Sequence, residues 1–118
     1  MKIASLRTRK VRPRRRKALE RTLEAWCVEK AKEQGWRSRK MNGLGFRDWP
    51  DRLFIRPPTS VVTKGSLKMY RSVVWVEFKR KGKKPTANQL LLHNFLRQCG
   101  AYVRVIDTPD KFLELLHE

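Results

Sequence analysis

The sequence predicts a single α/β domain in which a mixed β-sheet is flanked by helices. A chain of 118 residues can form one hydrophobic core but not two. Its apolar residues recur with helical and extended periods, in the order α-β-β-β-α-β-α. Late in that series a strand is followed by one helix and a second strand, and a crossover of this kind favours a parallel pair.

The first 16 residues are expected to form a basic arm, and residues 17–118 the folded domain. The first 17 residues contain nine lysines or arginines and no acidic residue. Because like charges repel and few apolar side chains are available for burial, the arm is expected to be disordered without a ligand. The arm's candidates for salt-sensitive contacts with phosphate groups are Arg12, Arg14, Arg15 and Arg16.

The first predicted helix is Lys17–Gln34, which has an amphipathic apolar stripe and is followed by Gly35, a suitable residue to end a helix. Glu20 and Glu24 lie at the margin of the stripe. Glutamates in that position usually pair with a residue one turn away in solvent. They can instead reach round the helix into a site.

Four extended segments follow. Trp36–Met41 and Arg52–Arg56 are predicted strands, and the second is closed by two prolines. Thr59–Arg71 has two β-prone runs around Lys64-Gly65, and fits either a hairpin or a loop. Val73–Lys79 is the most β-prone run of the chain and is expected to be a central strand.

The second half is expected to continue with a helix, a strand and a helix. Thr86 and Gln89 fit a capping box, and Gly100 ends the helix that they open. Ala101–Ile106 is a predicted strand, and Thr108 caps a final short helix. The residues expected to be buried by the first of these helices are Leu91 or Leu92, Phe95, Leu96 and Cys99. His93 is expected to be an ordinary residue of the helix face.

The net charge of +18 points to a polyanionic partner. From Gln34 to Ile106 there are sixteen basic residues and three acidic ones. Nucleic acid fits better than an acidic membrane surface, because no expected helix opposes a wide apolar face to a basic face. No apolar run is long enough to span a membrane, and no secretory signal is expected. Cys27 and Cys99 are expected to be buried free thiols of a reducing compartment.

The few acidic residues in this strongly basic domain are candidates for a metal site. In an extended strand Glu77 and Lys79 project from the same face, about 7 Å apart at about 3.3 Å per residue. Asp51 sits at the mouth of the preceding core strand, and Asp48 is a nearby competitor. Carboxylate oxygens suit Mg²⁺, so Asp51 and Glu77 can hold one ion between adjacent strands. The plainer alternative for Glu77 and Lys79 is an ion pair at a sheet edge.

Three further side chains can complete this site. Lys79 can orient or help to deprotonate the attacking water and offset charge that develops on phosphorus. Gln89 can position the water or the phosphate if capping does not occupy it. Glu24, or Glu20 in its place, can add a ligand or bind a second metal. No other catalytic set competes, since the two histidines and two cysteines lack the spacing of a zinc site.

These motifs resemble the PD-(D/E)XK nuclease superfamily, through Pro50-Asp51 and Glu77-Phe78-Lys79. More narrowly, the chain resembles the VRR-NUC domain family from roughly Leu19 to Leu116. The matching positions are Glu24 (or Glu20), Gly35, Lys40, Pro50-Asp51-Arg52, Glu77-Phe78-Lys79, Gln89 and Gly100. Gly45 is displaced from the usual glycine before the Pro-Asp pair, and the stretch between the two acidic motifs is longer than is typical of the family.

The resemblance implies a restriction-endonuclease-like αβββαβ core and a Mg²⁺- or Mn²⁺-dependent DNA endonuclease. It implies catalytic roles for Asp51, Glu77, Lys79, Gln89 and Glu24, with metal ligation by the carboxylates. Such domains are often homodimers that cut branched DNA such as four-way junctions, and they occur in phages, which would place this one in the cytoplasm of a bacterial host. In the body of the domain, the candidates for DNA contact are Lys40, Arg52, Arg80, Lys81, Lys83 and Lys84.

Two other functions fit the same composition. A basic nucleic-acid-binding protein without catalysis would use Glu77 and Lys79 only as an ion pair. A nuclease that acts on RNA would need the same site. Metal-dependent cleavage that is lost on substitution of Glu77 separates the nucleases from the simple binder.

Overall fold

A four-stranded mixed sheet forms the centre of the computed structural model, which describes residues 13–43 and 45–118. The strands lie in the order β1-β2-β5-β6, and their bounds are β1 Arg37–Lys40, β2 Arg52–Ile55, β5 Val73–Phe78 and β6 Tyr102–Ile106. The pairs β1–β2 and β2–β5 are antiparallel, whereas β5–β6 is parallel. The mixed sheet and the expected parallel pair are therefore confirmed.

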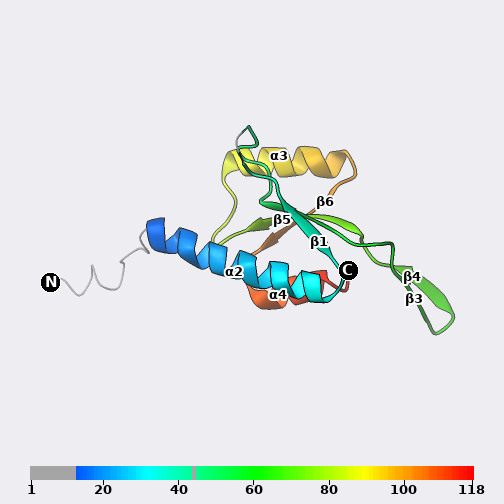
Figure 1. Cartoon of the computed structure of the whole chain (residues 1–118). Coiled ribbons are helices and arrows are strands. Elements are labelled where there is room, and N and C mark those ends of the chain that lie inside the picture. Colours follow the sequence, from blue (N-terminus) through cyan, green and yellow to red (C-terminus); the bar gives the residue numbers. More distant parts are fainter. Residues whose placement is uncertain (1–12, 44) are drawn as a thin grey trace.

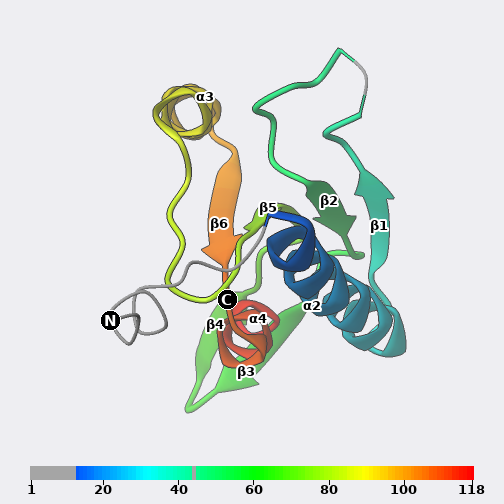
Figure 2. The ribbon, with the colours of Figure 1, turned by 90° about the vertical axis from the view of Figure 1, so that its left-hand side faces the viewer.

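Helices cover both faces of this sheet (Figures 1 and 2). Helices α2 (Pro13–Glu33) and α4 (Pro109–Leu115) lie on one face, and α3 (Ala87–Gln98) lies on the other. The hydrophobic core is between the sheet and the α2/α4 pair. Its buried members are Cys27, Ala31, Trp36, Phe54, Val74, Val76, Phe78, Ile106, Phe112, Leu115 and Leu116.

A β-hairpin projects from the body between β2 and β5 (Figure 1). It consists of β3 (Ser60–Thr63) and β4 (Ser66–Met69), which pair only with each other. The two turn residues have positive φ, 52° at Lys64 and 77° at Gly65, as two-residue hairpin turns require. The segment is thus a hairpin rather than a loop, and it accounts for the extra length between the two acidic motifs.

The first helix begins four residues earlier than predicted. Pro13 opens it, and a proline suits the first turn of a helix because the backbone donor that it lacks would be unpaired there. Arg14, Arg15 and Arg16, which we assigned to the arm, therefore belong to α2, although their side chains lie outside the described residues. The predictions for residues 1–12, including the role of Arg12, also lie outside the described part of the chain.

Helix α3 buries Leu96 as predicted, but the other residues that it directs towards the sheet differ from the prediction. Phe95 and Cys99 are exposed, and Leu91 is 70% exposed, whereas His93 is fully buried. Three adjacent leucines at the start of the helix are compatible with several rotations about its axis. The rotation that the structure adopts directs Gln89 and His93, four residues apart, towards the sheet. The prediction of a buried Cys99 was wrong, and that of a buried Cys27 is confirmed.

Candidate active site

The end of β5 carries a buried acid and a buried base. Glu77 is 3% exposed and Lys79 is 9% exposed. The Lys79 Nζ lies 3.2 Å from Glu77 Oε2, and the Gln89 side-chain amide donates to the same oxygen over 3.2 Å. The other oxygen, Oε1, is buried and has no hydrogen-bond partner among the described residues. A buried carboxylate oxygen without a donor is costly, so this position favours a cation.

Gln89 performs two tasks with the two ends of one amide. Its Oε1 accepts from the backbone N–H of Thr86 over 2.9 Å, while the Thr86 hydroxyl accepts from the Gln89 backbone N–H. This is the predicted capping box. Capping therefore occupies only the carbonyl end of the amide, and the NH₂ end is directed to Glu77. The start of α3 thus holds the carboxylate of β5 in place.

Asp51 lies next to Glu77 because of the strand register. The β2–β5 ladder ends with Arg52 opposite Val76, which brings Asp51 across from Glu77 one step further. Asp51 Oδ2 accepts from the backbone N–H of Phe78 over 2.7 Å, and Oδ1 accepts from the side-chain amide of Asn42. Asn42 is not among the site residues that the sequence predicts, because its role as a donor depends on a contact nine residues along the chain.

The charged forms of both carboxyl groups are destabilised, chiefly by burial. Burial raises the pKa of Asp51 to about 6, although the Phe78 backbone N–H and Lys40 act to lower it. Burial, followed by the charge of Asp51, raises the pKa of Glu77 to about 7, although Lys79 acts to lower it. Desolvation and like-charge repulsion are the usual causes of such shifts. A cation between the two groups would relieve both.

Glu20 and Glu24, one turn apart on α2, have different surroundings. Glu24 is 7% exposed, and both its oxygens are within 3.0 Å of Lys40 Nζ. One of them also accepts from Arg52 Nε at 2.5 Å. Glu20 accepts from the backbone N–H of Arg80 over 3.4 Å, and its charge contributes to the raised pKa of Glu77. Glu24 therefore anchors two basic side chains, whereas Glu20 faces the Glu77 site.

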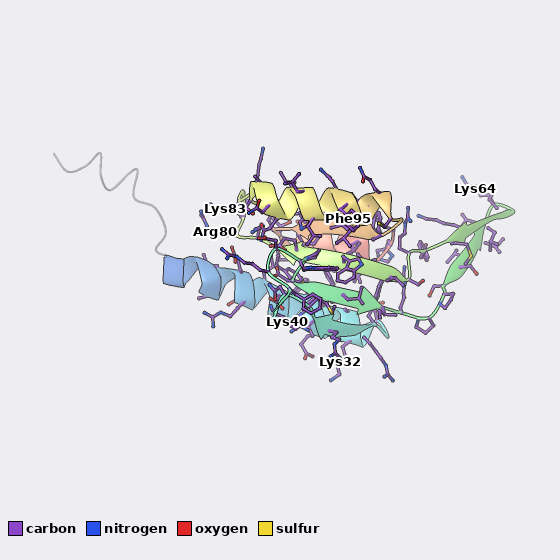
Figure 3. All side chains as sticks on the ribbon, turned by 90° about the horizontal axis from the view of Figure 1, so that it is seen from above. Lys32, Lys40, Lys64, Arg80, Lys83 and Phe95 are labelled. Carbon is purple, nitrogen blue, oxygen red and sulfur yellow. The ribbon has the colours of Figure 1, made fainter. Side chains whose placement is uncertain are left out.

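A cleft of about 220 Å³ lies between the two α2 glutamates and Asp51. Its lining residues are Glu20, Arg21, Glu24, Lys40, Asn42, Asp51 and Phe78. The basic loop 80–84 connects β5 to α3. Arg80 and Lys83 lie near the start of α3 in Figure 3, at the opposite end of the molecule from Lys64 at the hairpin tip. Arg21 and Lys40 thus line the cleft, and the basic loop adjoins it through the backbone N–H of Arg80, which donates to Glu20.

The residues present fit a divalent cation at two carboxylates rather than three. Within residues 13–43 and 45–118, no group of three or more His, Cys, Asp or Glu side chains is arranged to hold a metal ion. Glu24 lines the cleft with Asp51, but its oxygens pair with Lys40 and Arg52, so its role as a further ligand stays a prediction. Asp51 and Glu77 remain as oxygen donors of the type that Mg²⁺ prefers.

His93 is the buried residue that sequence reasoning missed. It lies one turn after Gln89 on the inner side of α3, and neither ring nitrogen has a hydrogen-bond partner among the described residues. Burial lowers its pKa to about 4, helped by the charges of Arg97 and Lys79, so the ring is neutral at pH 7. No signal in the sequence distinguishes this histidine from an exposed one, since leucines flank it on only one side.

Comparison with solved structures gives a clear relationship. A solved structure described as a VRR-NUC domain superposes with a TM-score of 0.66 and 26% sequence identity, over 85% of this chain and 96% of that chain. No protein-family model matches the sequence, and no curated protein matches it. No helix within the described residues is long and apolar enough to cross a membrane.

The fold, the Asp51–Glu77–Lys79 site and this likeness support a nuclease of the restriction-endonuclease-like type. Within that class, the likeness to a VRR-NUC domain and the motifs named above support the VRR-NUC family.

Proposed function

We propose that the protein is a metal-dependent DNA endonuclease that hydrolyses phosphodiester bonds. One observation carries the proposal: Glu77 is buried beside Asp51 with one oxygen unpartnered among the described residues, and Lys79 contacts its other oxygen. A structural ion pair needs no second carboxylate, whereas here the charge of Asp51 further disfavours ionised Glu77, and a cation would compensate both groups. Mg²⁺ or Mn²⁺ held by Asp51 and Glu77 would polarise the scissile phosphate.

The protein's own groups have separate tasks in this proposal. Asn42 and the Phe78 backbone N–H fix the Asp51 carboxylate, and Gln89 fixes that of Glu77. Lys79, held next to Glu77, offsets negative charge on the phosphate and orients the attacking water. Glu20 adjoins the site as an outer carboxylate. Glu24 acts through the basic side chains of Lys40 and Arg52, which it holds at the cleft.

The substrate and its setting follow from charge and from the family resemblance. Phosphate contacts come from Lys40 and Arg52 at the cleft and from the basic loop 80–84, with the N-terminal arginines as further contacts. We propose branched DNA, such as a four-way junction, as the preferred substrate and a homodimer as the active form. The protein would then act in phage replication, recombination or repair, in the cytoplasm of a bacterial host.

Strand cleavage of labelled DNA tests the proposal. Linear, nicked, flap and four-way-junction substrates are incubated with Mg²⁺, Mn²⁺ or EDTA, using the wild type and Lys79→Ala. We expect cleavage that requires metal and falls at least about a thousandfold in Lys79→Ala. Lys32→Ala, which removes an exposed lysine from the last turn of α2, is the matched control and keeps full activity.

Tight binding without cleavage of any DNA, in either metal, would show that the protein is a basic nucleic-acid-binding protein. Cleavage of the same branched structures made of RNA, but not of DNA, would reassign the substrate. Both alternatives predict different results for Glu77→Ala. A simple binder keeps its affinity in that variant, whereas either nuclease loses metal-dependent cutting.

A further inference from the structure

Helix α3 exposes an apolar face that nothing in the described chain covers. Leu91 is 70% exposed and Phe95 is 58% exposed, and Cys99 continues the same row at the next turn. Leu90, which is 43% exposed, widens the row at its start. Figure 3 shows Phe95 on α3, and the loop residues Arg80 and Lys83 near the start of that helix. Adjoining exposed apolar side chains of this size usually mark an interaction surface.

The same face is free of charge in a chain that is otherwise densely basic. No lysine, arginine, aspartate or glutamate occurs between Lys84 and Arg97, although the net charge is +18. The guanidinium of Arg97 donates to the backbone carbonyl of Val103 and to the side chain of Asn94. It is therefore held towards β6 rather than towards the apolar row. A surface without cations is poorly suited to phosphate, so this face is unlike the nucleic-acid side of the molecule.

We propose that this face binds a second copy of the chain, so that two α3 helices pack against each other. Two molecules of charge +18 repel, and an uncharged apolar face allows contact with the least repulsion. Leu91, Phe95 and Cys99 form an i±4 ridge, and two such ridges interdigitate at a crossing angle of about 50°. This face would be the contact surface of the homodimer proposed above. The proposal rests on that homodimer and is independent of catalysis.

The hairpin offers a competing apolar surface. The register of β3 and β4 puts Val62, Leu67 and Met69 on one side of the hairpin, where they are 59–70% exposed. However, Lys64 is at the tip of the hairpin and Lys68 is on its other side, and the hairpin has no acid to balance these two charges. Charge therefore favours α3 over the hairpin as the contact between identical basic chains.

Mass measured against concentration tests this proposal, by sedimentation equilibrium without DNA or metal. Because the face is small compared with the roughly 800 Å² per partner of a stable interface, we expect a weak dimer that forms as concentration rises. The mass should increase from 14.1 kDa towards twice that value, at a salt concentration that screens the net charge. Leu91→Lys/Phe95→Lys should raise the dissociation constant at least about tenfold.

Two matched variants make the result specific to α3. Val62→Lys/Leu67→Lys places the same two charges on the hairpin, and Leu113→Lys places one on α4, where the leucine is 41% exposed. Both should dimerise like the wild type, and all variants should keep its melting temperature. Alkylation of the exposed Cys99 should also slow as the wild type is concentrated, while the buried Cys27 stays unreactive.

A wild type that stays monomeric up to about 1 mM, a concentration at which even millimolar affinities are detected, would overturn the proposal. Loss of the dimer in the hairpin variant but not in the α3 variant would also overturn it. Neither result bears on cleavage, which is measured separately with Glu77 and Lys79 variants.

Discussion

The two faces of the sheet contrast in what they bury. The face under α2 and α4 holds mainly apolar side chains from the strands, such as Val74, Val76 and Phe78, which pack into one continuous core, and its charged pairs with Glu24 lie at the edge. The face under α3 holds Glu77, Lys79 and His93, which are equally buried but polar. The chain therefore separates the two requirements of a small enzyme. One face supplies stability, and the other accepts charged groups whose burial is unfavourable for folding.

The site face also differs in how its helix is attached. Buried side chains of α3 include His93 and Leu96, and the capping-box glutamine reaches Glu77 directly. The apolar side chains Leu91 and Phe95 point away from the sheet. A helix that is held by polar contacts at one end and by few apolar ones elsewhere is expected to add less to stability than α2 or α4.

The largest effect on stability is expected on the core face. Phe112 is fully buried, and its ring lies 5.4 Å from that of Phe54. Phe112→Ala should lower the free energy of unfolding by about 3–5 kcal/mol, because it removes apolar contact and leaves a cavity. Chemical denaturation followed by circular dichroism measures the change. Leu91→Ala on α3 is the control, and a loss there of similar size would remove the contrast between the faces.

The buried charge of Glu24 should give the next largest effect. Glu24→Gln weakens the contacts with Lys40 and Arg52, so we expect a loss of about 1–3 kcal/mol in the free energy of unfolding. Glu20→Gln, one turn away, should change stability by less than about 0.5 kcal/mol and should instead reduce cleavage. Equal losses of stability in both variants would mean that the two glutamates do not divide the tasks as described.

The folded protein should become more stable when the buried negative charge of Glu77 on the α3 face is removed. The folded-state pKa of Glu77 is about 7, above its ordinary value of 4.5, so Glu77 favours the folded state only while it is protonated. That contribution is complete below about pH 4.5 and is lost as the pH rises through about 7. In EDTA at pH 8, Glu77→Gln should therefore gain about 1–3 kcal/mol over the wild type, and the gain should vanish near pH 4.

Thermal melts from pH 4 to pH 8 in EDTA measure this dependence, with Glu33→Gln as an exposed control. Mg²⁺ should raise the melting temperature of the wild type at pH 8 and not that of Glu77→Gln, because a cation compensates the ionised carboxylates. A wild type whose stability relative to Glu77→Gln did not change with pH would contradict the assignment of an uncompensated buried charge.

The smallest effect on stability is expected where the start of α3 contacts the sheet through Gln89. Gln89→Ala removes one half of the capping box and the donor to Glu77, at a cost of about 1 kcal/mol. Gln89→Glu should restore the cap but not the donor, so it should recover stability without recovering cleavage. Recovery of both in Gln89→Glu would mean that the contact with Glu77 does not position the carboxylate.

The sequence by itself determined the elements and most of the site. Local rules suffice for the capping box at Thr86, the glycines that end α2 and α3, and the alternation along β5 that separates Val76 from Glu77. The order of elements also predicted the parallel β5–β6 pair. These features depend on residues within a few positions of each other, or on a topological rule with few exceptions.

Only the tertiary structure decided the rest. Glu24 meets Lys40 and Arg52 across 16 and 28 positions of the chain, and its periodicity does not reveal those partners. The rotation of α3, which buries His93 and exposes Leu91, depends on what the sheet presents beneath the helix. Helical spacing defines which residues share a side, but the packing of distant segments determines which side is buried.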